Sequence, residues 1–405
     1  MNHIQLLVGT ALLLIGSLCQ AAAEEPKKSL RIEPSSYPSS LQVNGPRLKS
    51  VNVWCSLRER CDINRYVQAM GVCGLYVIER RIVRVDLYNS DDICDEGRNG
   101  PEKGYSVKSV AKSLTSTLLG RRLAENYSIH TRSEFEVVMQ RTVGSFLKLT
   151  DRLALAEGYS QVKLDDLLLM RSAIRWREAD WPALLSDSVA FDNQVRIPPR
   201  RKSLIEFASK YRLARHHAGD FNYSALDAAM PVAVAKSLTP GRPLLKEFEK
   251  GVWGMIGAAH FATWNVDVRG DPIGPCCFNA RLDDLARFGD FVLNKGRGSI
   301  PEAWFDLATA PIPARFRGLE LESDEQDASC DLGYGYFWWL RKGRTDYFAY
   351  GRYGQFIHIY PEDHVVIVQM SDWYAVPVGS DARCIALKTH DAIVNRLRRT
   401  GIGKE

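Results

Sequence analysis

The sequence predicts a mixed α/β fold of the α+β type. In this fold, both chain ends build one antiparallel sheet, helices flank it, and a mostly helical region is inserted at about 121–296. Runs rich in Val and Ile stand near the N-terminal end, at 74–89. Helix-period apolar patterns fill the middle of the chain. Aromatic and β-branched runs return after Gly333 and precede a closing amphipathic stretch.

Each expected element has its own signal in the sequence. The alternation in Gly74–Asn89 predicts two paired strands, and the runs after Gly333 predict three antiparallel strands. Apolar periodicity predicts the helices, which are Ser109 to about Asn126, Lys163–Ile174, Tyr223–Leu238, Arg281–Gly296 and Cys384–Leu397. Pro231 lies in the middle of the third of these, so we expect that helix to be kinked or split.

The N-terminus has the pattern of an export signal. Leu6–Leu18 is an uncharged apolar core that is too short to span a bilayer comfortably, and Ala21–Ala23 offers small residues for cleavage. We therefore expect a signal peptide at 1–23, a leader arm or linker at 24–47 and one domain at 48–405. The predicted location is the periplasm or the exterior of the cell, with no membrane span.

Composition and charge indicate which classes of binding partner to expect. The chain has 405 residues and a formal net charge of only +5. Since no basic run is interleaved with aromatic residues, nucleic acid is not an expected partner. We expect a small-molecule partner, and the oligomeric state stays open.

The cysteines indicate disulfides rather than a metal site. Nine are present, and eight remain once Cys19 leaves with the signal peptide. An even number in an exported chain predicts disulfides, and short separations favour Cys55–Cys61 and Cys73–Cys94. A ring closed between neighbours needs strained backbone, so Cys276 and Cys277 are expected to pair elsewhere or to stay free. The spacing of Cys and His residues matches no metal motif, so neither a metal nor another cofactor is predicted.

One short stretch, "SVAKSLTS" (109–116), suggests covalent chemistry. Ser109 and Lys112 are three residues apart, which places them on one face of a helix. A serine hydroxyl needs a base beside it, and lysine acts as a base only in its neutral form, which burial and neighbouring cations favour. At a helix start the backbone N–H of Ser109 is also free to bind an oxyanion. Alone, the motif is weak, since Ser and Lys at a helix start are usually capping and surface residues.

An ordered set of segments strengthens this interpretation. "SVAKSLTS" resembles the nucleophile motif of the serine β-lactamase and penicillin-binding superfamily, in its class C-like branch of esterases and aminohexanoate-dimer hydrolases. Matching segments follow collinearly over about Leu75–Leu397, and they are "KLDDLLLMRSAI", "FNYSALDAA", "WGMIGAAHFATWNVD", "FNARLDDLARFGDFVLNKG" and "YGRYGQFIHIYPEDHVVIVQMSD". The resemblance implies a β-lactamase/transpeptidase-like fold, which agrees with the fold predicted from the residues.

The resemblance also implies a role for individual residues. Ser109 would be the acyl-forming nucleophile, Lys112 its base and Tyr223 the proton relay to the leaving group. The oxyanion would lie between the backbone N–H groups of Ser109 and Arg352, on a strand end that also contains Gly351 and Tyr353. Trp176 and Trp181 lie where the family often builds a wall of the pocket; they either cover an acyl chain or belong to the core.

Two departures from the family pattern shape the expected activity. Ala225 stands where β-lactamases carry asparagine, and Ala349-Tyr350-Gly351 stands where they carry Lys-Thr-Gly. The missing lysine and threonine would hold a β-lactam carboxylate, so the resemblance implies ester or amide hydrolysis instead. The Arg352 side chain either anchors a substrate carboxylate, or it points to solvent or pairs with an acidic residue on a neighbouring loop. A β-lactamase or D-amino-acid peptidase, and a binding or sensor protein without turnover, remain the alternatives.

Overall fold

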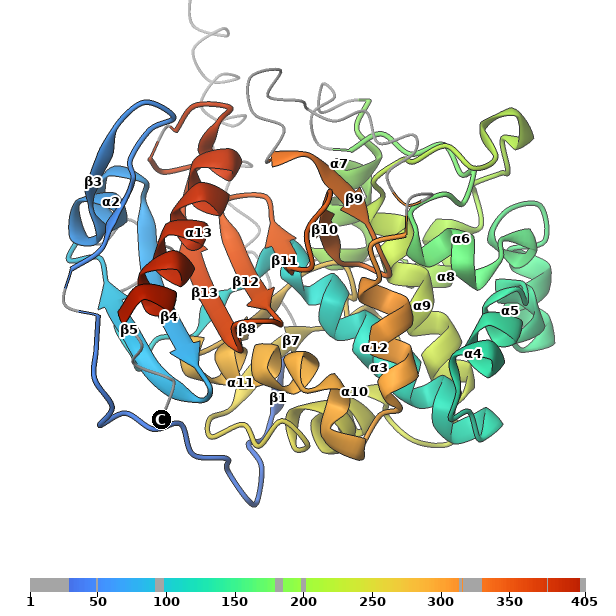
Figure 1. The fold of residues 1–405 in the computed structure, drawn as a ribbon. Coiled ribbons are helices and arrows are strands. Elements are labelled where there is room, and N and C mark those ends of the chain that lie inside the picture. The colour runs from blue at the N-terminus through green and yellow to red at the C-terminus, as the bar shows by residue number, and fades with distance from the viewer. Residues whose placement is uncertain are drawn as a thin grey trace, which may run out of the picture.

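The protein is built around one seven-stranded antiparallel sheet with helices on both faces (Figure 1). The computed structural model describes residues 29–48, 50–91, 98–178, 185–197, 202–312, 315, 330–376 and 378–400. The predicted signal peptide at 1–23 lies outside these residues. No helix in the described part combines the length and apolar character needed to cross a membrane.

The central sheet has the strand order β5-β4-β13-β12-β11-β10-β9, so both chain ends contribute to it as predicted. Its strands are β4 (Val72–Glu79), β5 (Ile82–Tyr88), β9 (Leu332–Tyr334), β10 (Trp339–Arg341), β11 (Tyr347–Gly351), β12 (Gln355–Tyr360) and β13 (Val365–Ser371). Two smaller sheets contain β1 (Ser29–Ile32), β7 (Ala262–Asn265), β8 (Phe278–Ala280) and β6 (Tyr105–Ser106) in one, and β2 (Asn52–Trp54) and β3 (Arg60–Asp62) in the other.

Helices form the rest of the molecule, and most of them gather on one side of the sheet (Figure 1). The α-helices are α2 (Ile63–Ala69), α3 (Ala111–Tyr127), α4 (Arg132–Met139), α5 (Leu149–Ala154), α6 (Leu164–Leu168), α7 (Asp187–Phe191), α8 (Leu204–Ala208), α9 (Ala225–Ser237), α10 (Leu244–Phe248), α11 (Leu282–Leu293), α12 (Glu302–Thr309) and α13 (Ala382–Thr400).

Alternation along the strands determines which helix covers which face. In β13, Val365 and Ile367 join the apolar cluster of α2 and α13. Val366 and Val368 point the other way and join the large core that includes α3 and α11. Helix α11 packs closely against the sheet here, since a Cβ added at Gly289 would lie 2.4 Å from a methyl carbon of Val366.

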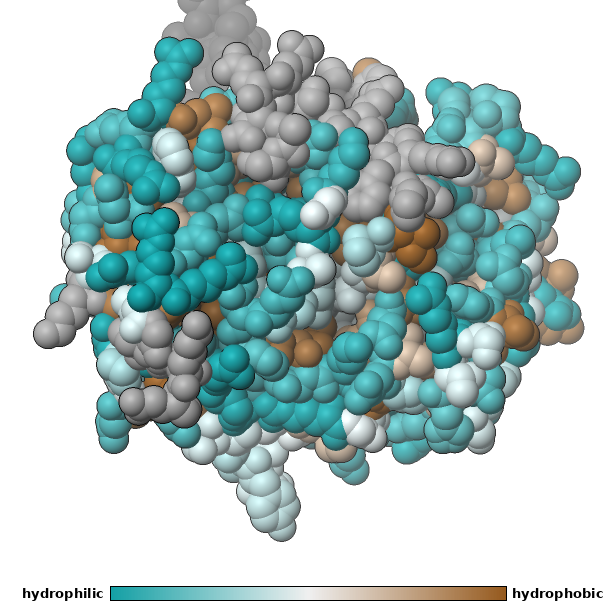
Figure 2. Space-filling model, in the orientation of Figure 1, coloured by the Kyte–Doolittle hydropathy of each residue, from teal (hydrophilic) through white to brown (hydrophobic). Residues whose placement is uncertain are grey.

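The surface is mostly hydrophilic on the face drawn in Figure 2. Hydrophobic side chains form small separate groups there among hydrophilic ones.

Several predicted elements differ in extent from those observed. The run after Gly333 forms five strands rather than three, because turns divide its aromatic stretches. Phe337 at φ 64° separates β9 from β10, and Gly354 at φ 85° lies between β11 and β12. A side chain at Gly354 would meet the Trp373 ring at 2.4 Å, so only glycine fits there.

The helical predictions need three corrections. The helix expected at Lys163–Ile174 is only five residues long, since Met170 and Ala173 adopt positive φ and turn the chain. The helix expected at Tyr223–Leu238 begins at Ala225 and is not split at Pro231. The inserted region also contains β7 and β8, and β7 pairs with β1 of the segment predicted as a leader arm.

The disulfides confirm one predicted pair. Cys55–Cys61 joins the ends of the β2–β3 hairpin, as expected. Cys73 is also disulfide-bonded, but its predicted partner Cys94 lies outside the described residues.

Two other disulfides were not predicted. Cys330–Cys384 ties the segment before β9 to α13 across a sequence separation of 54 residues. Cys276 and Cys277 are bonded to each other, so the prediction that they pair elsewhere or stay free is wrong. Cys277 adopts φ 71° within this ring, and hydrogen bonds hold the loop on both sides of it.

Candidate active site

Ser109 lies in a strained turn at the start of α3. The chain leaves β6, Lys108 adopts φ 48°, and a 3-10 turn at Lys108–Val110 leads directly into the helix. The Val107 N–H donates to the Phe278 carbonyl at 3.0 Å, which ties this turn to β8. A left-handed non-glycine residue beside a potential nucleophile is typical of a functional site. Ser109 itself is half-buried.

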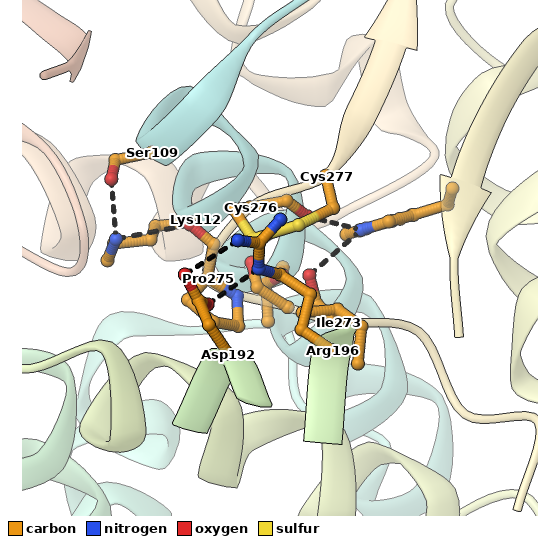
Figure 3. The surroundings of a disulfide bond; sticks show 11 residues. Ser109, Lys112, Asp192, Arg196, Ile273, Pro275, Cys276 and Cys277 are labelled. Atoms are coloured by element: carbon orange, nitrogen blue, oxygen red, sulfur yellow. Dashed lines mark hydrogen bonds and ion pairs between the residues drawn. A yellow bond between two sulfur atoms is a disulfide. The ribbon is translucent and has the colours of Figure 1, made fainter. Parts of the chain in front are cut away.

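Lys112 is buried, with 2% of its surface exposed, and it lies directly below Ser109. Its Nζ is 2.8 Å from Ser109 Oγ and 3.1 Å from the Pro275 carbonyl oxygen (Figure 3). The first contact follows from the three-residue spacing on a helix, as predicted. The second comes from a residue 163 positions away, which no local pattern in the sequence indicated.

Tyr223 lies beside the same amine. Lys112 Nζ is 4.8 Å from the centroid of the Tyr223 ring. Tyr223 is the residue just before the N-cap of α9. The ring is stacked on Trp339 of β10, with centroids 5.8 Å apart and an interplanar angle of 24°. The structure thus brings together the three residues predicted to be catalytic. It adds Trp339, which the aromatic run "YGYFWWL" indicated only as part of a strand.

The end of β11 lies next to the Ser109 turn. A Cβ added at Gly351 would lie 2.9 Å from the Val107 carbonyl oxygen, so glycine permits this close approach. The following Arg352 side chain is exposed, and its guanidinium carbon is 5.8 Å from the Tyr353 ring centroid. Tyr353 lines a hollow of about 150 Å³ together with Ser106 and Lys108.

A larger cleft of about 930 Å³ opens beside Tyr223. Trp176 lines this cleft, and only 5% of its surface is exposed. The residue therefore forms part of the cleft wall and part of the hydrophobic core. Its ring packs against Phe191 and Tyr211. Two arginines, Arg175 and Arg177, also line the cleft. Trp181, the second predicted wall residue, lies outside the described residues.

The carboxylate of Asp227 is buried in the first turn of α9, just after Tyr223, and the sequence analysis did not predict its role. Asp227 Oδ1 accepts hydrogen bonds from the Tyr159 hydroxyl at 2.7 Å and from the Ser172 hydroxyl at 2.8 Å. Asp227 Oδ2 has no hydrogen-bond partner among the described residues. Complete burial raises the pKa of Asp227 from its ordinary value of 3.8 to about 7, even though these hydroxyl groups favour the charged form.

This raised pKa makes stability depend on pH. Between pH 4 and pH 7 the folded protein holds a proton on Asp227 that the unfolded chain has lost, so the free energy of unfolding falls as pH rises. Asp227→Asn stays neutral and keeps the acceptor oxygen. Its stability relative to wild type should therefore rise by about 1.4 kcal/mol per pH unit between about pH 5 and pH 6.5. Urea unfolding of both proteins across this range measures the difference; a difference independent of pH would contradict the prediction.

One group among the described residues has the spacing of metal ligands. His260, Asp283 and Asp284 bring their ligand atoms within 4.8 Å of one another. Arg287 already pairs with both carboxylates, at 2.6 and 3.0 Å, and the Ala259 and His260 N–H groups donate to Asp284. Arg287 offsets one of the two carboxylate charges and the N–H groups hold Asp284 in place, so we assign the cluster a structural role in fixing α11.

Solved structures share this fold over most of the chain. A protein from Bacillus anthracis assigned as a 6-aminohexanoate-dimer hydrolase aligns with a TM-score of 0.72 at 14% identity, covering 92% of each chain. EstCE1, a hydrolase with promiscuous acyltransferase activity, aligns with a TM-score of 0.57 at 14% identity, covering 82% of this chain and 96% of that one. A class C beta-lactamase aligns with a TM-score of 0.55 at 12% identity, covering 81% and 93%. At these identities the likeness concerns the fold.

Family membership follows from a sequence comparison. A search among curated proteins finds no match. The family model named Beta-lactamase, however, matches residues 68–387, which is most of the chain and includes Ser109, Lys112 and Tyr223. The chain therefore belongs to the beta-lactamase family of serine hydrolases.

Proposed function

We propose that this protein is an exported serine hydrolase that cleaves a small ester or amide through an acyl-enzyme on Ser109. The contact that carries the proposal is the 2.8 Å distance between Lys112 Nζ and Ser109 Oγ, formed by a buried lysine at the start of a helix. A serine hydroxyl becomes a good nucleophile only when a base removes its proton during attack, and Lys112 is the basic side chain that hydrogen-bonds Ser109 Oγ.

In the proposed reaction, Ser109 Oγ attacks the substrate carbonyl while Lys112 takes its proton. The oxyanion binds between the backbone N–H groups of Ser109 and Arg352, because the end of β11 lies beside the Ser109 turn. Tyr223, over the lysine amine, passes the proton to the leaving group. Water then attacks the acyl-enzyme by the reverse of these proton transfers, which releases the acid and restores Ser109.

The surroundings of the site support an ester or amide rather than a β-lactam. The strand end that would hold a β-lactam carboxylate carries Ala349 and Tyr350 in place of lysine and threonine. The cleft beside Tyr223 is lined by aromatic side chains and is large enough for an acyl chain. Export is supported by the disulfides, which form and persist in oxidising compartments.

Intact-mass analysis tests this function directly. The protein is treated with a fluorophosphonate and, separately, with a penicillin. Ser109 Oγ should displace fluoride, so the mass should increase by that of the reagent less HF, and Ser109→Ala should show no increase. A slow penicillin adduct on Ser109 would favour the peptidase or sensor alternative, and no adduct with either reagent would contradict the proposal.

A further inference from the structure

The loop between β7 and β8, at 266–277, returns to the catalytic face of α3. Thr115 Oγ1 donates to the Gly274 carbonyl at 3.0 Å, and Lys112 Nζ donates to the next carbonyl, that of Pro275, at 3.1 Å. Lys112 and Thr115 are three residues apart and lie on one face of α3, so this face donates hydrogen bonds to two successive carbonyls of the loop. Whatever holds the loop in place therefore also holds the lysine amine.

Several contacts hold the loop where it meets the lysine. Immediately after Pro275, the Cys276–Cys277 disulfide closes a ring within the chain, and Cys277 adopts φ 71° (Figure 3). The Trp264 Nε1–H donates to the carbonyls of Ile273 at 3.0 Å and of Cys276 at 2.9 Å. The Cys277 carbonyl accepts from the Asn265 N–H at 3.1 Å, where the chain enters β8. These contacts fix the peptide plane within the ring and the one that follows it. The peptide that carries the Pro275 carbonyl is held by the Cys276 N–H, which donates to the Ile273 carbonyl at 3.2 Å.

We propose that the Cys276–Cys277 disulfide is a positioning element for the base Lys112, acting through the Pro275 carbonyl. This inference rests on the proposed function. A neutral amine has one lone pair, which must face Ser109 to accept its proton. An N–H donated to the Pro275 carbonyl restricts the rotation of the amine, so that one of its two other positions faces Ser109 Oγ and can hold the lone pair.

The disulfide matters for this geometry because of the backbone it enforces. Residues other than glycine avoid positive φ, and the covalent ring holds Cys277 there. Without the ring, Cys277 is free to return to negative φ, which rotates the neighbouring peptide planes. The Pro275 carbonyl then moves away from Nζ. Misplacement of a catalytic group by about 1 Å costs on the order of 100-fold in rate.

The test compares two disulfide deletions. Cys276→Ser/Cys277→Ser removes the ring beside Lys112, and the matched control Cys55→Ser/Cys61→Ser removes another short-range disulfide, in the β2–β3 hairpin. We expect the first variant to lose roughly 10- to 100-fold in kcat and in the rate of fluorophosphonate labelling, with KM nearly unchanged. The control should keep both rates. Equal loss in the two variants would overturn the inference.

A double-mutant cycle separates positioning from a merely structural effect. The same cysteine changes are introduced into Lys112→Ala, and slow labelling of Ser109 is followed by mass. If the disulfide acts through Lys112, its removal should change the labelling rate of Lys112→Ala by less than about twofold. A loss as large as that in the wild-type background would show that the disulfide acts through some other part of the structure.

A second variant guards against misfolding. Glycine adopts positive φ freely, so Cys276→Ser/Cys277→Gly accommodates the observed backbone without the ring. This variant should unfold cooperatively and recover much of the kcat that Cys276→Ser/Cys277→Ser loses, because glycine keeps the backbone at positive φ without the ring. A loss as large as that of Cys276→Ser/Cys277→Ser in this folded variant would contradict the inference. Wild-type protein that is not labelled at Ser109 would instead contradict the proposed function, so the two failures are distinguishable.

Discussion

Ser109→Ala should abolish hydrolysis of an activated ester while the protein stays folded. Loss of the nucleophile of a serine hydrolase lowers kcat by on the order of a million-fold, because the acyl-enzyme can no longer form. Only one oxygen atom is removed from a half-buried position, so the fold should tolerate the change. Steady-state hydrolysis of an activated ester, with circular dichroism on the same samples, measures both effects.

A neighbouring serine provides a matched control. Ser116 lies further along α3, is fully buried, and its Oγ has no hydrogen-bond partner among the described residues. Ser116→Ala removes the same atom from the helix that follows the Ser109 turn and should leave kcat unchanged. Residual activity above a small fraction in Ser109→Ala would mean that another group is the nucleophile.

Lys112→Ala should be nearly as damaging as Ser109→Ala, and the double variant should be little worse than either. Residues that act as one unit lose function non-additively, because removal of either member already stops proton transfer and attack. Values of kcat/KM for the two single variants and the double variant, measured on one activated ester, provide the comparison. Multiplicative losses would mean that Lys112 is only a neighbour of the nucleophile.

Lys112→Arg distinguishes a base from a positive charge. Arginine keeps the charge and can reach Ser109, but it stays protonated at any pH at which the protein is folded. If Lys112 is the base, this variant should be as inactive as Lys112→Ala. Substantial activity would show that the site needs a cation near Ser109 and that proton removal occurs elsewhere.

The sequence predicted those contacts and elements that depend on residues close together in the chain. The three-residue spacing of Ser109 and Lys112 places both on one helix face, and the structure has that contact at 2.8 Å. Alternation in Gly74–Asn89 predicted β4 and β5, because side chains in a strand point alternately to two faces. The Cys55–Cys61 pair was predicted from its short separation, since its members are six positions apart.

Only the tertiary structure decided which distant groups complete the site. The Pro275 carbonyl reaches Lys112 across 163 residues, and Trp339 stacks on Tyr223 because β10 lies beside the start of α9. The Asp227 network likewise depends on burial, and the Cys276–Cys277 ring occurs in a loop with positive φ at Cys277. Periodicity in a sequence determines which face of an element is apolar, whereas the loops between elements are placed by packing. The parts of the site that come from loops were therefore beyond sequence reasoning.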